Sequence, residues 1–242
     1  MRWNSWGSLL LVGILGIALV PTYAGAQAPS PSPVGSFWIA PYLGVGFQSE
    51  YHDGLVQFAD GDLELLTLDP GSGVVFGARV GYRFAPSWTA QANLGYSKSD
   101  AQYVEDGTIR PDVGLSTTQL ELGVLYDMGS FPVGGKSAQF FLGGGLSLTF
   151  HSFDPFQWDG TFIEPSSTSL GVHGVVGLDI PLTPMLSLSS QAKLTVTSLS
   201  LGDLNDKIAL AEGEAIVQPL DGGIGTYFVL SVGVSIRPSL GG

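Results

Sequence analysis

The sequence predicts an all-β fold, an eight-stranded antiparallel up-and-down transmembrane β-barrel with four long external loops and short periplasmic turns. Three observations predict it. Eight stretches alternate apolar with small or polar residues, the connections between them alternate between short and long, and the apolar face of the stretches carries aromatic residues near the ends. Alternation with a period of two is typical of strands rather than helices.

The N-terminal segment is predicted to be separate from the barrel. Residues 9–20, LLLVGILGIALV, form an apolar run that is too short to cross a bilayer, which takes about 20 residues. Pro21 follows, and Ala24 and Ala26 give the A-x-A pattern of a cleavage site. We therefore predict a signal peptide over residues 1–26, a Pro/Ser linker over 27–35 and the barrel domain over 36–242.

The spacing of the eight stretches predicts how the strands are connected. The connections after the second, fourth and sixth strands are short, whereas the other four, at residues 48–72, 99–115, 151–166 and 199–224, are long. Tight turns at one end and long loops at the other are typical of outer-membrane barrels, and a Greek-key sandwich would not alternate in this way. The strands are expected at residues 36–47, 73–84, 88–99, 116–128, 138–150, 167–181, 185–198 and 225–237.

The chemistry of the two faces indicates which one points outward. In GVVFGARVGYRF, residues 73–84, Phe76 and Tyr82 share the apolar face, and Arg79 and Arg83 lie on the other. The polar faces consist mostly of Gly, Ser, Thr, Gln and Asn. A soluble lipocalin-like barrel would expose its polar face to water, and such a surface carries far more Lys and Glu. We therefore expect polar faces to line a narrow, filled interior and apolar faces to contact lipid.

Aromatic residues mark both ends of the apolar face. Because Trp and Tyr are enriched at the two membrane interfaces, two aromatic rims around an aliphatic band predict a barrel that spans a bilayer. The rims are Phe37, Tyr82, Phe84, Trp88, Tyr126 and Phe140 toward the short turns, and Phe47, Phe76, Tyr96, Phe150 and Phe228 toward the long loops.

The composition excludes several classes of function. Charged residues make up 12% of the chain, against about 25% in a typical soluble domain. The net charge of −12 argues against nucleic acid as a partner. The chain has no cysteine, which excludes disulfides, thiolate metal sites and a thiol nucleophile.

Over residues 36–237, this pattern of faces, turns and loops resembles the small eight-stranded outer-membrane β-barrels of the OmpA, OmpX and opacity-protein type. The resemblance implies a location in the bacterial outer membrane, with lipid and lipopolysaccharide as partners. We expect a monomer without cofactors and without a further domain after the barrel. Barrels of this type often end in an aromatic residue, whereas this chain runs SVGVSIRPSLGG to Gly242, which displaces that element toward residues 228–236.

The first candidate site is a network of ionisable residues on the inward faces. Counting from the short turns places four of them near the periplasmic rim and four near mid-membrane, with both signs of charge in each layer. Because an eight-stranded barrel is just wide enough for side chains to fill, the network is expected to plug the interior; a gated path for protons or ions is the alternative. The residues are Arg79, Arg83, Glu121, Asp127, His173, Asp179, Lys193 and Arg237.

Specific pairs are predicted within this network, because desolvating an unpaired ion is costly. Arg79 is expected to reach Glu121, and Arg83 to reach Asp127 or Asp179. Gly77 and Gly81 share the inward face with the arginines and are expected to leave room for their long side chains. The run FFLGGGLSL at residues 140–148 is expected to let bulky neighbours pass a tight wall, not to bind phosphate.

The second candidate site is the set of long loops, which hold all 21 acidic residues except Glu121, Asp127 and Asp179. Such an end is either a solvated, self-repelling surface or a place where divalent cations such as Ca²⁺ gather and bridge to anionic lipopolysaccharide. The stretch DGDLE at residues 60–64 lacks the spacing of an EF-hand. The candidate cation ligands in the first loop are Asp53, Asp60, Asp62 and Glu64.

Three classes of function stay open on this scaffold. We expect a non-enzymatic barrel that serves envelope structure or surface interaction through its loops. One alternative is a narrow channel for small or hydrophobic solutes, as in OmpW-like relatives. Another is a lipid A-modifying enzyme, for which His151, Ser152 and Asp154 in FHSFD supply the residue types of an activated nucleophile. Adjacent strand residues project to opposite faces, however, which argues against that set.

Overall fold

Eight long strands form the wall of the molecule in a computed structural model. The model describes residues 33–48, 51–57, 63–105, 108–109, 113–133, 135–158, 161–164, 166–198 and 224–238, so the predicted signal peptide lies outside the described residues. The wall strands are β1 (Phe37–Gln48), β4 (Ser72–Ala85), β5 (Trp88–Glu105), β7 (Val113–Val133), β8 (Lys136–Phe153), β11 (Ser166–Pro181), β12 (Leu186–Ser198) and β13 (Ile224–Ile236).

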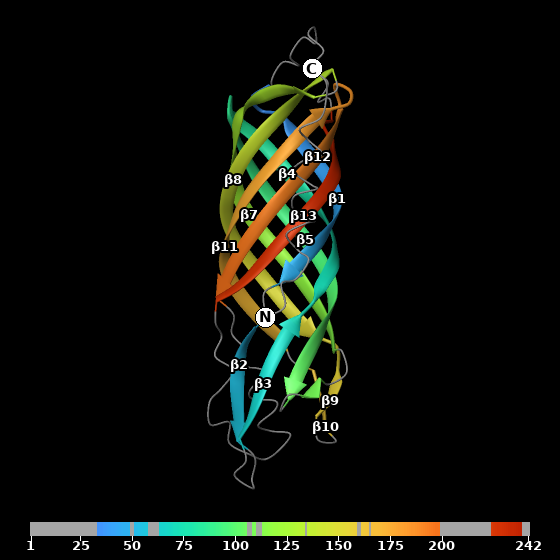
Figure 1. Ribbon diagram of the computed structural model, residues 1–242. Coiled ribbons are helices and arrows are strands. Elements are labelled where there is room, and N and C mark those ends of the chain that lie inside the picture. The colour runs from blue at the N-terminus through green and yellow to red at the C-terminus, as the bar shows by residue number, and fades with distance from the viewer. Residues whose placement is uncertain are drawn as a thin grey trace.

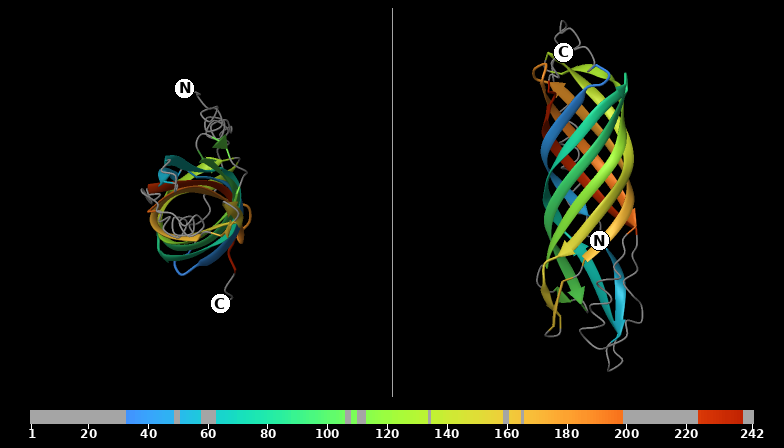
Figure 2. Two further views of the ribbon diagram at one scale, coloured as in Figure 1. Left: turned by 90° about the horizontal axis from the view of Figure 1, so that it is seen from below. Right: turned by 180° about the vertical axis from the view of Figure 1, so that it is seen from behind.

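These strands close into a ring (Figures 1 and 2). Each pairs antiparallel with its neighbours in the order β1-β4-β5-β7-β8-β11-β12-β13, and β13 returns to β1. The closing pair runs in register from Ile39 opposite Ile236 to Gln48 opposite Tyr227. Closure leaves no unpaired edge in the wall, as a backbone surrounded by lipid requires. The predicted eight-stranded up-and-down barrel is therefore confirmed.

The strands extend beyond their predicted bounds at the long-loop end, the lower end in Figure 1. The first long connection contains a hairpin of β2 (Tyr51–Gln57) and β3 (Leu63–Pro70), and β3 pairs with residues 101–105 of β5. Short strands β6 (Thr108–Ile109), β9 (Phe156–Trp158) and β10 (Thr161–Ile163) also lie in the long connections. The sequence predicts long loops here; backbone pairing continues past the wall because β5 offers a free edge to β3.

The short-turn end is tighter than predicted between β7 and β8. Residues 129–137 were expected to form a connection, but β7 continues to Val133 and β8 starts at Lys136. A bulge between Asp127 and Gly129 shifts the register, and Gly129 has a φ of 126°, a conformation that favours glycine. This hairpin therefore rises past its neighbours at the top of the barrel in Figure 1.

The outward face is apolar, as the alternation predicts. Leu43, Leu122, Leu146 and Leu170 are each more than 60% exposed, which in this fold means contact with lipid. Aromatic pairs join neighbouring strands at the rims: the Trp88 and Tyr126 ring centroids are 4.8 Å apart, those of Phe76 and Tyr96 5.1 Å, and those of Phe47 and Phe228 6.3 Å. Among the described residues, no helix is long and apolar enough to cross a bilayer.

The interior is filled mainly by polar side chains. Buried threonines, serines and glutamines line it beside the charged residues, and two small apolar clusters interrupt them. One cluster consists of Tyr42, Val75, Tyr227 and Val229. The other consists of Leu125, Phe141 and Val175, with Trp38 packed against it. The layers that these side chains form along the barrel axis define the candidate site.

Candidate functional site inside the barrel

The first group of interior charges lies near the short turns, and we call it the turn-end layer: Arg83, Asp127, Asp179 and Arg237. All four side chains line one cavity. Arg83 Nη2 and Asp127 Oδ2 form an ion pair, with 5% and 14% of the side chains exposed, so the predicted pair is present. Asp179 and Arg237 face the same cavity. Two bases therefore stand against two carboxylates in this layer.

The second group lies deeper in the barrel, and we call it the mid-barrel layer: Arg79, Glu121, His173 and Lys193. These four also share a cavity. Lys193 Nζ lies 2.7 Å from Glu121 Oε1 and donates a second hydrogen bond to Gln119 Oε1 at 3.1 Å. Asn93 Nδ2 donates to the other Glu121 oxygen at 2.7 Å. The only carboxylate of this layer is thus fully engaged.

Arg79 has no carboxylate partner among the described residues, so the predicted Arg79–Glu121 pair is wrong. The sheet register gives the reason. Arg79 on β4 stands opposite Asn93 on β5, and Asn93 stands opposite Glu121 on β7, so the asparagine occupies the row between the two charges. Arg79 Nη2 instead donates to Ser231 Oγ, and its guanidinium carbon lies 4.0 Å from the centroid of the Tyr42 ring.

These neighbours compensate the Arg79 charge only in part. The side chain is 4% exposed, so it has left bulk water almost completely. A desolvated cation–π contact contributes about 2 kcal/mol, whereas burying an unpaired ion costs several kcal/mol. Arg79 Nη1 has no hydrogen-bond partner among the described residues. An inward arginine can therefore lack an acid, and the face assignment of β4 holds because Val74 and Phe76 remain exposed outside.

The inward glycines serve aromatic side chains of β1 rather than the arginines, which corrects the sequence prediction. A Cβ at Gly81 would overlap the Trp38 indole, and one at Gly77 or Gly95 would come within 2.6 Å of the Tyr42 hydroxyl oxygen. In the predicted glycine run, a Cβ at Gly143 would collide with Val124 and Leu125, as expected for a tight wall. The glycines thus place two aromatic rings in the barrel centre.

The apolar cluster of Trp38, Leu125, Phe141 and Val175 lies between the two charge layers, and we call it the septum. Leu125 and Val175 line the mid-barrel cavity, and Trp38, Leu125 and Phe141 line the turn-end cavity. Sequence reasoning did not single out these residues. A bulky, apolar residue on an otherwise small and polar inward face was the available signal.

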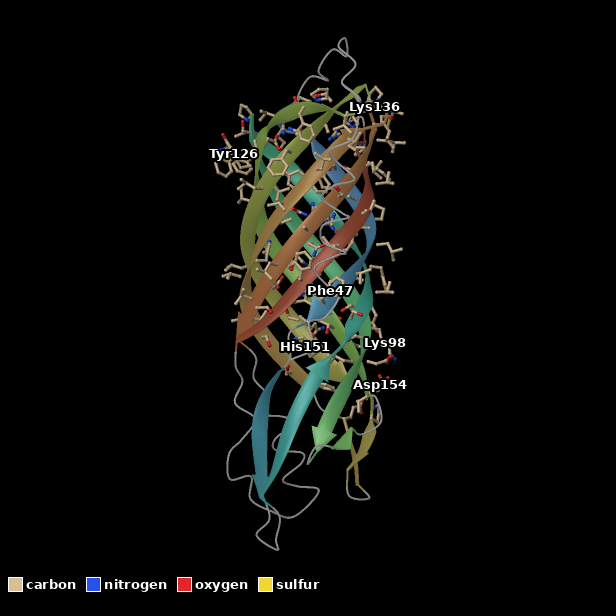
Figure 3. The ribbon with its side chains drawn as sticks, in the orientation of Figure 1. Phe47, Lys98, Tyr126, Lys136, His151 and Asp154 are labelled. Carbon is tan, nitrogen blue, oxygen red and sulfur yellow. The ribbon has the colours of Figure 1, made fainter. Side chains whose placement is uncertain are left out.

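The residues FHSFD of the enzyme alternative do not converge. His151 is buried inside the barrel, where Nδ1 lies 3.1 Å from Thr117 Oγ1, whereas Ser152 is exposed on the outer side. Asp154 lies outside as well and accepts a hydrogen bond from Lys98 Nζ at 3.0 Å (Figure 3). The strand geometry therefore separates the histidine from the other two groups, as alternation predicts.

The candidate cation ligands of the first loop, Asp53, Asp60, Asp62 and Glu64, lie outside the side chains that the structure describes. Within the described part of the chain, no three His, Asp or Glu side chains gather as metal ligands. The cation hypothesis thus stays a prediction from the acidic sequence of the loops.

A closed barrel with a lipid-facing apolar wall and a polar interior defines an integral membrane protein of the outer-membrane type. The chain belongs to the outer membrane protein beta-barrel domain family, whose model matches residues 12–210, and it is a protein of the bacterial outer membrane.

The chain is similar to several solved structures, and the match to AlkL supports the fold. Outer membrane protein AlkL matches with a TM-score of 0.53 and 17% identity over 91% of this chain and 99% of that one. Neisserial surface protein A matches with a TM-score of 0.46 and 16% identity over 84% and 97%. Ail, the attachment invasion locus protein of Yersinia pestis, matches at 0.42 and 12% over 85% and 100%. No curated protein matches the sequence.

Proposed function

We propose that this protein is a non-enzymatic, closed barrel that serves envelope structure or surface interaction through its acidic loops. The observation that carries the proposal is the septum, whose four apolar side chains lie between two polar cavities. The interior of an eight-stranded barrel is just wide enough for side chains to fill it. The buried Lys193–Glu121 and Arg83–Asp127 pairs support the same interpretation, because they fix long side chains across the interior.

Conductance in planar lipid bilayers tests the closed barrel. We expect the wild-type protein to give no steady single-channel current. Replacing both Trp38 and Phe141 with alanine removes two rings of the septum and is expected to produce current, because water can then join the two cavities. Phe150→Ala is the matched control: it removes a phenyl ring from the same strand as Phe141 but on the outer face, where the ring is 42% exposed. Large, steady currents from the wild type would overturn the proposal.

The alternative of a narrow path for small solutes draws on one observation, the polar cavities on both sides of the septum. Their lining of arginine, lysine, asparagine and glutamine favours small polar solutes or ions over hydrophobic ones. Liposome swelling separates the two proposals, since a closed barrel leaves the swelling rate at that of empty liposomes. Swelling faster than that of empty liposomes, with the wild-type protein and its intact septum, would favour the transporter.

The role of the loops is tested separately at the long-loop end. If the acids of the first loop gather divalent cations, calorimetric titration of the full-length protein with Ca²⁺ gives heat above the buffer. Replacing Asp53, Asp60, Asp62 and Glu64 with their amides is expected to remove part of that heat. A titration that matches the buffer leaves the loops as a solvated, repulsive surface.

A further inference from the structure

We propose that the mid-barrel cavity binds one small inorganic anion, of the size of chloride or bromide, beside Arg79. The first observation is the charge of the interior. The two charge layers contain four bases, Arg79, Arg83, Lys193 and Arg237, against three carboxylates, Glu121, Asp127 and Asp179. Lys193 holds Glu121, Arg83 holds Asp127, and Arg237 shares the turn-end cavity with Asp179. Arg79 is the base that is left over.

The second observation is a set of buried donors that point to the same ligand. Among the described residues, Arg79 Nη1 and Gln191 Nε2 have no hydrogen-bond partner, and both residues line one cavity. An amide nitrogen and a guanidinium nitrogen can only donate. Ser231 links Arg79 and Gln191, because its hydroxyl oxygen accepts a hydrogen bond from Arg79 and the hydroxyl donates to the Gln191 backbone oxygen at 3.4 Å. An anion accepts hydrogen bonds from several donors at once, whereas a cation would be repelled by Arg79.

The third observation is the room and the isolation of the cavity. Gly123 lies in its wall, and a Cβ there would come within 3.1 Å of His173 Nε2, so the glycine keeps the space open. The septum closes the cavity toward the short turns, and the wall strands separate it from the lipid. A water molecule would satisfy the donors but leave the positive charge unbalanced, whereas a halide does both. The balanced turn-end layer offers no such reason to bind an ion.

Thermal unfolding of the folded, detergent-solubilised protein tests the site with sodium bromide as the probe. Sodium gluconate, whose anion is too bulky for a water-sized cavity, replaces bromide at constant ionic strength. We expect the wild-type midpoint to rise in bromide and to saturate, by roughly 2–4 °C for a chain of this size. Arg79→Gln is expected to abolish the bromide dependence. Arg83→Gln removes the same charge from the balanced layer and is expected to retain it.

Gln191→Glu keeps the test decisive if Arg79→Gln fails to fold. This variant places a carboxylate in the cavity and supplies the missing negative charge. It is expected to unfold at a higher temperature than the wild type in gluconate and to show no response to bromide. Crystals grown in bromide should give an anomalous peak within hydrogen-bond distance of the Arg79 guanidinium. Equal wild-type midpoints in bromide and gluconate would overturn the proposal, as would a bromide response that survives in Gln191→Glu.

Discussion

Both charge layers of the barrel contain bases and carboxylates, but they match these charges differently. In the turn-end layer two bases meet two acids, and Arg83 pairs directly with Asp127. In the mid-barrel layer two bases share one carboxylate, and Lys193 takes it. Within each layer the charged residues lie at similar depths along the barrel axis, so depth does not determine which base pairs with which acid. The cross-strand neighbours decide it, because Asn93 stands between Arg79 and Glu121.

The largest effect is expected from Glu121→Gln, which removes the only carboxylate of the mid-barrel layer. The change leaves Lys193 and Arg79 together in the interior with no carboxylate in their layer. Removing one partner of a buried pair should lower the free energy of unfolding by about 3–5 kcal/mol, measured by urea titration in lipid vesicles. The double variant with Lys193→Gln removes both charges and should recover much of the loss. If the double variant is no more stable than the single one, the pairing argument is wrong.

Asp127→Asn is expected to have a smaller effect, because the turn-end layer retains a second acid. Arg83 loses its charged partner, but Asp179 lines the same cavity and can take part of its place. A loss of about 1.5–3 kcal/mol is expected, the range for a hydrogen bond to a charged group. The same urea titration measures it. A loss as large as that of Glu121→Gln would show that Asp179 does not compensate for the missing Asp127 charge.

Gly77→Ala tests whether the ring of Tyr42 supports Arg79. A methyl group here would push against the Tyr42 hydroxyl and the Leu94 carbonyl, and such overpacking typically costs about 1–3 kcal/mol. Gly174→Ala is the matched control, since no heavy atom lies within 4 Å of its Cβ position. Urea titration of both variants should separate them. Equal stability of the two variants would mean that Tyr42 and the neighbouring backbone can move to make room for a methyl group at Gly77.

The smallest effect is expected outside the barrel, at Lys98 and Asp154. Their ion pair at 3.0 Å is exposed, with more than half of each side chain accessible. Water and salt screen such a pair, so Lys98→Ala should leave the unfolding midpoint unchanged. Asp154→Asn should behave in the same way. A clear shift in either variant would show that the outer end of the barrel contributes to stability through this contact.

The eight wall strands could be predicted from particular residues. In β4, the alternation of Val74 and Phe76 with Arg79 and Arg83 specified both the strand and its inward face, and the structure places them so. Trp88 and Tyr126 marked the short-turn end of the lipid-facing band, and Phe76 and Tyr96 marked its long-loop end. The hairpin of β2 and β3 was missed, because its pairing depends on the edge of β5, which lies more than 30 residues further along the chain.

The sequence by itself determined the barrel, its strand order and the side of the wall on which each charge lies. Period-two alternation and the lengths of the connections are local properties of the chain, and lipid demands an apolar outer face. Only the tertiary structure decided which charges meet. Register brings Asn93 between Arg79 and Glu121, and it carries Trp38 over Gly81 and Tyr42 over Gly77. These contacts join residues on different strands, so no single stretch of sequence contains them.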